Sequence, residues 1–220
     1  MRRIDEPELL DEHDAARGDV ERSLRDLRRI NRFLGGIRTY RKLLARAAPD
    51  RAAPLRVVDL GAGTADCLES LTDYSKLTPV AFDFNIIHLR YQRDGSRVHR
   101  VVADAMRLPL RDGAVDLITS SHFFHHFSPD QNAGILRDAL RAARRGVIVN
   151  DTRRHPLPLL FVQLLCVLRL FGRITRYDAP ASIRRGYTDA EAREIAGMAS
   201  APTVETTRIW PFRFGLLIWK

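Results

Sequence analysis

The sequence predicts an α/β protein built on one doubly wound sheet of seven strands. Short apolar runs, several of them ending at Gly or an acidic residue, recur through residues 55–151, and stretches with helical spacing separate them. Two further strand-like runs stand at residues 203–219. Apolar runs of this kind suit parallel strands buried on both faces, which need helices as connections. The final pair suits an antiparallel hairpin.

Length and composition limit the chain to one main domain. Its 220 residues, 45% of them hydrophobic, can bury one sizeable core with an appendage. The formal charge of +9 is compatible with a nucleic acid or an anionic membrane surface as partner. However, only three of the 36 basic residues are Lys, and the Arg residues are spread along the chain. The charge by itself therefore favours neither partner.

The sequence predicts no metal site, disulfide or membrane-spanning segment. Cys67 and Cys166 lack the spacing of a zinc site or a disulfide framework. The acidic start of the chain is unlike a signal peptide, and no window holds the ~18 apolar residues of a spanning helix. We therefore expect a cytoplasmic protein without a bound metal.

Residues 1–48 predict a helical cap, and we assign residues 49–220 to the sheet domain. Apolar residues recur at helical spacing through residues 20–34, with Arg on the other face, and Gly35-Gly36 then interrupts the helix. Two interpretations are open. The cap covers the sheet, or it forms a lid that closes over a substrate site.

Residues 55–64, LRVVDLGAGT, organise the rest of the sheet domain. A buried strand ends at Asp59, and Gly61 and Gly63 allow a sharp turn with close approach of a ligand. A dinucleotide-binding turn would carry a third Gly where Asp66 stands, and an acidic residue there would repel a pyrophosphate. A strand-to-helix connection without a ligand is the alternative interpretation.

Acidic residues also end the next two strands. Asp83 follows the strand at 78–82 and lies one strand–helix–strand unit beyond Asp59. A carboxylate at this position can accept hydrogen bonds from both ribose hydroxyls, as it does in a dehydrogenase, although a solvated loop acid is also possible. Asp104 follows the strand at 98–102 in the same way.

The Asp-x-Gly-x-Gly run resembles the first motif of class I S-adenosylmethionine-dependent methyltransferases, with Ala65 where a third Gly often stands. The resemblance implies a Rossmann-like sheet, methyltransferase activity and S-adenosyl-L-methionine as cofactor. In that family the Gly loop wraps the methionine part, the second acid holds the ribose, and the third meets the adenine. The cofactor-binding residues that it implies here are Asp59, Gly61, Ala62, Gly63, Asp83, Phe84, Asp104, Ala105, Ser120 and Ser121.

The segment SSHFFHHF at 120–127 resembles the stretch after the fourth strand of many small-molecule methyltransferases, including those of quinone biosynthesis. Methyl transfer mainly requires positioning, but a phenol or enol acceptor must also lose a proton to a base. We predict His125 as this base, with His126 and His122 behind it. Asp151, at the end of the fifth strand, is a second candidate. A His that only caps the backbone and an Asp that only forms a turn are the alternatives.

Capping signals predict two later helices. Ser128 and Gln131 form one capping box, and Gly146 is expected to stop that helix. Thr188 and Glu191 form another. Strands at 203–209 and 214–219, joined through Pro211, are then expected to add an antiparallel hairpin.

Residues 155–186 contain a segment that is apolar nearly all round. It is too short to span a membrane and must be covered by protein, ligand or lipid. Because insertions after the fifth strand build the acceptor pocket in the resembled family, we interpret this segment as a substrate cap with an apolar interior and an Arg rim.

The predicted activity is methyl transfer to a small, apolar, hydroxylated acceptor of secondary metabolism, such as a phenol, quinol or polyketide, with O-methylation favoured. Methylation of carbon on a quinone precursor, or of RNA or protein, is the alternative. The chain lacks the Asn/Asp-Pro-Pro-Tyr/Phe and Pro-Cys signatures of nucleobase methylation. We therefore expect no specific nucleic acid partner.

Two other classes of protein are open alternatives: a non-catalytic cofactor-binding protein, and a peripheral membrane protein that uses residues 157–171 for lipid contact. We expect a monomer or homodimer with weak membrane-surface association.

Overall fold

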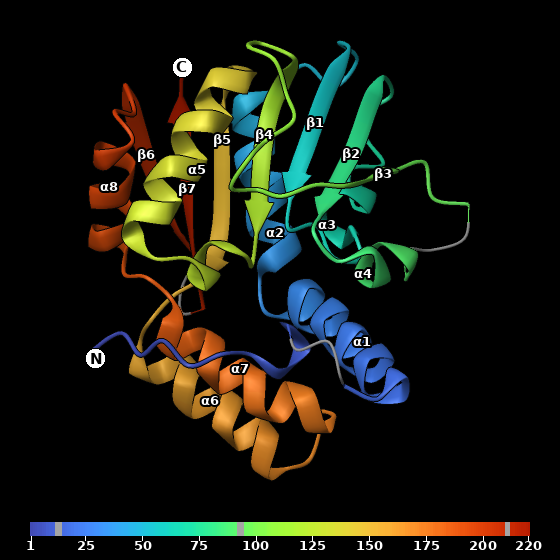
Figure 1. Ribbon diagram of the computed structural model, residues 1–220, viewed down its shortest axis with the longest axis vertical. Coiled ribbons are helices and arrows are strands. Elements are labelled where there is room, and N and C mark those ends of the chain that lie inside the picture. Colours follow the sequence, from blue (N-terminus) through green and yellow to red (C-terminus); the bar gives the residue numbers. More distant parts are fainter. Residues whose placement is uncertain (12–14, 92–94, 210–211) are drawn as a thin grey trace.

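The computed structural model describes residues 1–11, 15–91, 95–209 and 212–220, and there it places seven strands in the order β3-β2-β1-β4-β5-β7-β6 (Figure 1). The first five strands run parallel, and β7 pairs antiparallel with both β5 and β6. The sheet confirms the predicted fold class and its C-terminal hairpin. The strands are β1 (Leu55–Leu60), β2 (Leu77–Asp83), β3 (His99–Val102), β4 (Val115–Ser121), β5 (Ala143–Thr152), β6 (Thr203–Ile209) and β7 (Arg213–Trp219).

Helices cover both faces of this sheet (Figure 1). On one face, α2 (Gly36–Ala47) and the short α3 (Asp66–Glu69) pack against a set of strand side chains, one of which is Val57 of β1. On the other face, α5 (Pro129–Ala142) and α8 (Asp189–Met198) pack with those that include Val58. Because neighbouring residues of a strand point to opposite faces, both sides of β1 are buried, as its unbroken apolar run predicts.

A third group of helices lies beyond the carboxyl ends of the parallel strands (Figure 1). It contains the N-terminal segment with η1 (Leu9–Asp11), α1 (Arg17–Phe33), α6 (Pro156–Val167) and α7 (Arg173–Arg185). We call this group the cap. Polar contacts inside it are buried: the Gly172 N–H donates to Asp26 Oδ2 at 2.7 Å, and the hydroxyls of Thr175 and Ser23 lie 3.1 Å apart.

The structure divides residues 1–48 between two layers. Helix α1 belongs to the cap, but α2 packs on the sheet, where Tyr40, Leu43 and Leu44 are fully buried. Gly35, with φ of 84°, lies between the two helices and turns the chain from one layer to the other. The expected boundary at residue 48 therefore does not follow the packing.

The expected stop of α5 at Gly146 is wrong. The helix ends at Ala142, and β5 begins at Ala143, which has extended backbone angles. Gly146 lies inside β5, where a Cβ would stand 2.2 Å from the carbonyl oxygen of Ile218 on β7. Gly146 thus allows β5 and β7 to approach each other closely and does not end the helix. Both capping boxes are confirmed, and the Pro211 junction lies outside the described residues.

Helix α6 presents its leucines outward. Leu160 and Leu164 are exposed, whereas Pro158 and Val162 on the other side are buried. The expected apolar interior of residues 155–186 is therefore not formed by these leucines. No helix among the described residues is long and apolar enough to cross a membrane.

Candidate active site

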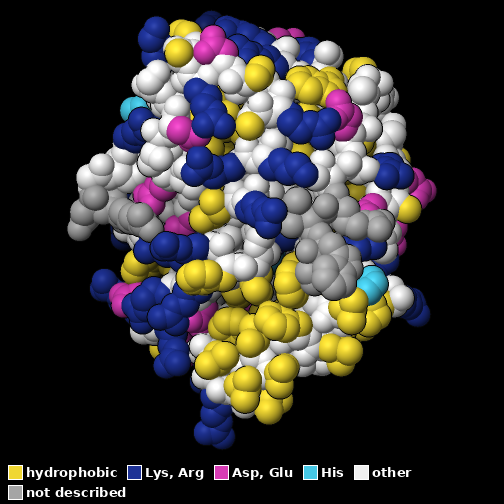
Figure 2. All heavy atoms as spheres, turned by 180° about the vertical axis from the view of Figure 1, so that it is seen from behind, with side chains coloured by type: hydrophobic (Ala, Val, Ile, Leu, Met, Phe, Trp, Pro, Cys, Tyr) yellow, Lys and Arg dark blue, Asp and Glu magenta, His cyan; other side chains and the backbone are white. Residues whose placement is uncertain are grey.

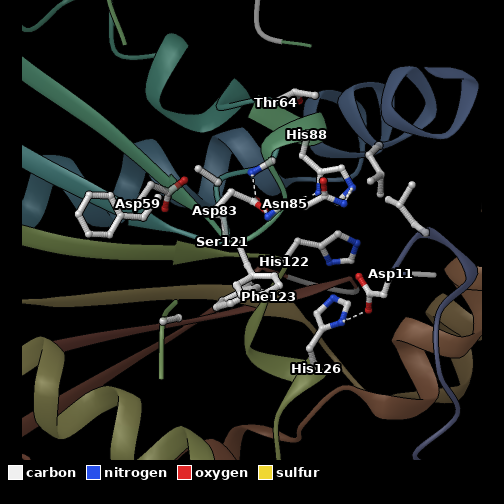
Figure 3. Close-up of a pocket in the computed structure, with 18 of the residues that line it drawn as sticks. Asp11, Asp59, Thr64, Asp83, Asn85, His88, Ser121, His122, Phe123 and His126 are labelled. Carbon is white, nitrogen blue, oxygen red and sulfur yellow. Dashed lines mark hydrogen bonds and ion pairs between the residues drawn. The ribbon is translucent and has the colours of Figure 1, made fainter. Parts of the chain in front are cut away.

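A cavity of about 470 Å³ lies between the carboxyl ends of the strands and the cap (Figure 3). The sheet side supplies the Gly loop after β1, the end of β2, the segment after β3 and the segment after β4. The cap side supplies η1 and the buried face of α1. Residues that line the cavity from the cap are Glu8, Leu10, Asp11, Leu24, Leu27 and Asn31.

The Gly loop is held against the wall of this cavity. Gly61 has a φ of 62°, and a Cβ at this position would lie 2.1 Å from the ring of Phe123. Gly61 is therefore required both by its backbone conformation and by the aromatic ring beside it. Gly63 has a φ of 53°, and its N–H donates to Asp83 Oδ2 at 2.8 Å.

The Asp83 carboxylate fastens two segments at the end of β2. Besides the Gly63 amide, it accepts a hydrogen bond at Oδ1 from the Asn85 N–H at 2.8 Å. Asn85 in turn caps α4 (Ile86–Arg90) by accepting from the Ile87 N–H. Asp83 thus joins the Gly loop to the next helix start, so its loss would disturb both sides of the cavity.

Asp59 is a buried acid on the cavity wall without an ion pair in the described part of the chain. Burial raises the pKa of Asp59 to about 7, and the nearby Asp83 charge adds to this, although the Thr119 hydroxyl donates to it at 2.6 Å. A cationic ligand group would stabilise the ionised form of this carboxylate. The ammonium of a methionine moiety fits that requirement.

Nine of the ten residues expected to bind cofactor line the cavity. Asp104 accepts from the Met106 N–H at 2.8 Å, which shapes the turn after β3. Ser120 is the exception, because it is buried and does not line the cavity, whereas Ser121 does.

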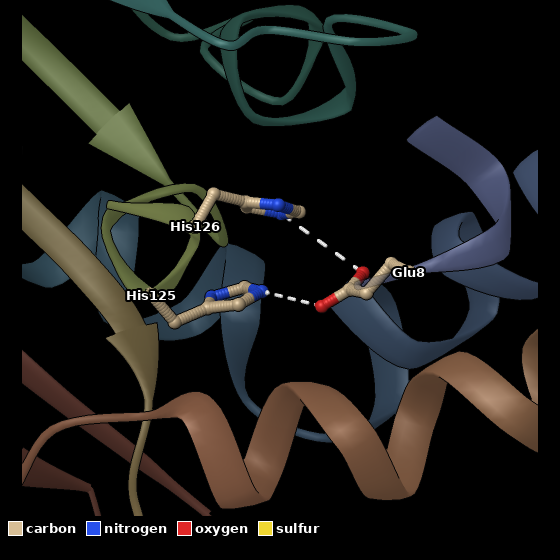
Figure 4. A group of neighbouring side chains, drawn as sticks. All are labelled: Glu8, His125 and His126. Carbon is tan, nitrogen blue, oxygen red and sulfur yellow. Dashed lines mark hydrogen bonds and ion pairs between the residues drawn. The ribbon is translucent and has the colours of Figure 1, made fainter. Parts of the chain in front are cut away.

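His125 lies behind the cavity wall between two carboxylates, one of which, Glu8, is shown in Figure 4. Its Nδ1 is 2.8 Å from Asp151 Oδ1, and its Nε2 is 3.1 Å from Glu8 Oε1. Burial alone would lower the pKa of His125, but these two carboxylates raise it to about 9. Reciprocally, and against the effect of burial, His125 holds the pKa of Glu8 at about 2 and that of Asp151 well below its usual value.

This arrangement differs from the one expected for His125 and Asp151. Both side chains are 1% exposed, and neither lines the cavity. A protonated imidazole with both nitrogens in hydrogen bonds has no lone pair to accept a proton. The two residues form a buried ion pair that fastens the segment after β4 to β5 and, through Glu8, to the cap.

His122 and His126 do line the cavity (Figure 3). His126 Nδ1 lies 3.0 Å from Asp11 Oδ2, and its Nε2 lies 3.9 Å from Glu8 Oε2. His122 has a φ of 57°, and its Nδ1 is 3.6 Å from Asp151 Oδ1. Burial lowers the pKa of His122 to about 4, so this imidazole is neutral near pH 7.

The same side chains have the spacing of a metal site. Donor atoms of Glu8, His125 and His126 lie within 4.8 Å of one another, as do those of His122, His125 and Asp151. The hydrogen bonds of His125 already satisfy both of its nitrogens, and these bonds account for the arrangement without an ion.

Comparison with known proteins identifies the domain. Residues 57–146 match the family model of methyltransferase domains, a range that contains the Gly loop and the acids after β2 and β3. The chain therefore contains a methyltransferase domain. Its cofactor is S-adenosyl-L-methionine. No curated protein sequence matches the chain.

Solved methyltransferase structures share the fold. An S-adenosylmethionine-dependent methyltransferase from Aquifex aeolicus is 18% identical with a TM-score of 0.62, over 90% of this chain and 97% of that one. A Pyrococcus horikoshii protein is 17% identical with a TM-score of 0.66, over 87% and 93%. Magnesium protoporphyrin IX methyltransferase from Synechocystis, solved with bound S-adenosylhomocysteine, is 15% identical with a TM-score of 0.59, over 85% and 84%. At these identities the likeness shows the fold alone.

The methyltransferase has a second, smaller cavity of about 40 Å³ inside the cap. Its walls come from α1, α6, α7 and β7 and are mainly apolar, and it shares Glu8, Leu10, Leu27 and His122 with the larger cavity. Arg213 enters this wall: it is 2% exposed, and its Nη2 donates to Asn31 Oδ1 at 3.1 Å. Nη1 of Arg213 makes no hydrogen bond within the described part of the chain.

The sequence predicts a cap or lid from the N-terminal segment but does not predict Glu8 and Asp11 as residues of the site. Both stand in an acidic stretch whose sequence indicates only that it is unlike a signal peptide. Their positions follow no helical or strand period that would place them beside His125 and His126. The one usable signal is the excess of acidic residues near the start of an otherwise basic chain.

Proposed function

We propose that this methyltransferase acts on a small, apolar, hydroxylated acceptor such as a phenol or quinol, with transfer to oxygen. The observation that carries the proposal is that the two cavities are neighbours, with His122 and Leu27 in the walls of both. The larger cavity has the acidic strand ends suited to a nucleoside cofactor, and the smaller one combines apolar side chains with the polar Asp178 and Arg213. The smaller cavity, of about 40 Å³, is too small for a phenol ring, so the acceptor would lie in the larger cavity with its hydroxyl near the cofactor and an apolar substituent toward the smaller one.

In this proposal His126 is the base. With Asp11 Oδ2 3.0 Å from Nδ1, the neutral imidazole would carry its proton on Nδ1, which would leave the Nε2 lone pair for the acceptor hydroxyl proton. When bound, the cofactor supplies a methyl group activated by a sulfonium. His126 takes the acceptor proton at Nε2, and the neutral His122 lines both cavities. His125 and Asp151 hold the segment that carries both of these imidazoles.

The cofactor roles that we propose follow the order of the strand ends. Asp59 faces the ammonium of the methionine moiety, Asp83 the ribose, and Asp104 with Ala105 the adenine. The peptide of Gly61 lines the part of the cavity in which the methionine moiety would lie. The cap that closes this site comprises residues 1–34 and 153–187, and the remaining residues form the sheet domain.

An acceptor panel tests the function. We would incubate the protein with S-adenosylmethionine and simple phenols, alkylphenols and hydroquinones, then identify products by mass spectrometry and NMR. The proposal expects O-methyl ethers, with kcat/KM rising as the apolar part of the acceptor grows. A carbon-methylated product would favour the alternative reaction on a quinone precursor. Methylation of RNA or protein but of no phenol would refute the proposal.

A further inference from the structure

The outward side of α6 carries a continuous apolar surface, which Figure 2 shows at the foot of the molecule. Val167 is 78% exposed, Leu160 62% and Leu164 54%. Single exposed leucines are ordinary, but a contiguous group of this size marks a surface that meets another apolar phase. The residues that we call the apolar α6 face are Leu157, Leu160, Phe161, Leu164, Val167, Leu168 and Leu170.

The charge on the chain segment that carries this face has one sign. The sequence contains no acidic residue between Asp151 and Asp178. Within that stretch Arg169, Arg173 and Arg176 are exposed and form no ion pair among the described residues. We call these three the basic rim. Figure 2 shows Lys and Arg side chains beside the apolar region.

We propose that the apolar α6 face and the basic rim dock the methyltransferase on an anionic lipid surface. Helix α6 has 12 residues, about 18 Å at 1.5 Å per residue, so it lies along an interface and does not cross one. Apolar side chains enter the boundary between headgroups and acyl chains, while guanidinium groups bind lipid phosphates. The two contributions reinforce each other because they come from one continuous surface.

A second copy of the chain fits this surface less well. In a two-fold symmetric dimer the apolar α6 face of one copy would pack against the same face of the other copy. The basic rims of the two copies would then lie close together. No acidic side chain on the same stretch would offset their repulsion. Anionic headgroups provide the opposite charge.

The position of α6 also connects this surface to the acceptor site, a step that rests on the proposed function. Pro158 and Val162, on the inner side of the helix, line the smaller cavity. One helix therefore separates the lipid surface from the apolar cavity. An acceptor dissolved in the bilayer would have a short path into the enzyme, and we infer that the acceptor is lipid-soluble.

Vesicle binding tests the inference without turnover. Sedimentation with phosphatidylglycerol vesicles is compared with phosphatidylcholine vesicles at low and high salt. We expect preference for the anionic vesicles, weakened by salt. Leu164→Asp, and separately Arg173→Glu with Arg176→Glu, should each lower the partition constant at least ~10-fold. Met198→Asp, an equivalent change on exposed α8, should leave it unchanged.

Unaltered S-adenosylhomocysteine binding by calorimetry would show that each variant is folded. Equal binding to both vesicle types, or undiminished binding by Leu164→Asp, would overturn the inference. So would sedimentation velocity showing a dimer that Leu164→Asp dissociates. If the protein binds anionic vesicles but methylates no phenol, the lipid-docking inference is supported and the proposed function is refuted. The experiment therefore distinguishes failure of one proposal from failure of the other.

Discussion

His126 Nδ1 lies 3.0 Å from Asp11 Oδ2, and this contact joins the cap to the segment after β4 on the wall of the cofactor cavity. A carboxylate in this position fixes both the ring orientation and the tautomer of the imidazole. His126 differs from its neighbour His125 in position, because His126 lines the cavity whereas His125 is buried behind the cavity wall.

His126→Ala should lower kcat ~10² to 10⁴-fold with an oxygen acceptor, because the acceptor would lose its base. Asp11→Asn should lower kcat less, and it should alter the pH profile because the tautomer is no longer fixed. Affinity for S-adenosylhomocysteine should be unchanged in both. His99→Ala, at an exposed position of β3, is the control. If His126→Ala retains kcat within about threefold, proton transfer to His126 is not part of the reaction.

The buried His125 ion pair predicts a pH-dependent stability. Folding raises the pKa of His125 from 6.5 to about 9, so the folded chain holds a proton that the unfolded chain releases between these values. The stabilisation is complete below about pH 6.5 and is lost as pH rises through about 9. Over this pH range the free energy of unfolding should fall by about 3 kcal/mol.

Asp151 and Glu8 predict a second loss on the acid side. Their folded pKa values lie below 3.8 and 4.5, so their stabilisation is present above these values and is lost on acidification. Denaturant titrations of the parent and of His125→Gln, from about pH 2.5 to about pH 9.5, would measure both effects. Parallel pH curves for the two proteins would show that His125 is neutral when folded.

Asp83→Asn should weaken S-adenosylhomocysteine binding at least ~10-fold, or about 1.4 kcal/mol. The variant loses the ionised acceptor for ribose hydroxyls and weakens the link to the Gly63 amide. Asp112→Asn removes an acid whose side chain is 79% exposed, so its affinity should equal that of the parent. Equal calorimetric affinity in the two variants would contradict the ribose role.

Gly61→Ala should also reduce S-adenosylhomocysteine affinity at least ~10-fold. A Cβ there would lie 2.1 Å from the Phe123 ring, on a backbone with φ of 62°, so the ring and the loop must both shift. We expect a stability loss of about 1–3 kcal/mol as well. Gly197→Ala, where a Cβ meets nothing within 4 Å, controls for the substitution. A variant with parental affinity would show that the loop tolerates the displaced ring.

Removal of metal ions should leave methyl transfer unchanged. Hydrogen bonds already satisfy both nitrogens of His125, which belongs to both groups with metal-site spacing. Activity after dialysis against a chelator, together with elemental analysis of the purified protein, measures this. Loss of activity that zinc restores would place an ion between Glu8, His125 and His126.

The sequence by itself determined the sheet and most of its ligand-facing edge. Apolar β-branched runs specify strands locally, and the residues directly after them must reach the same edge because the strands are parallel. The positions of Asp83 and Gly61 at this edge were therefore predictable from the strand spacing, whereas their cofactor roles are implied by the family resemblance. The C-terminal hairpin was predictable from its composition, and β7 indeed pairs antiparallel with β5.

Only the tertiary structure decided which histidine faces the cavity and what surrounds the others. Successive residues His125 and His126 are equivalent in any sequence pattern, but the 3-10 turn from Phe124 to His126 directs one ring inward and the other to the cavity. Glu8 and Asp11 reach them through the path of a segment without regular periodicity. Likewise, the apolar composition of α6 predicts burial, yet Leu164 is exposed, because the cap offers only one surface and Val162 occupies it. Local patterns encode local structure, whereas contacts between distant segments depend on how whole layers pack.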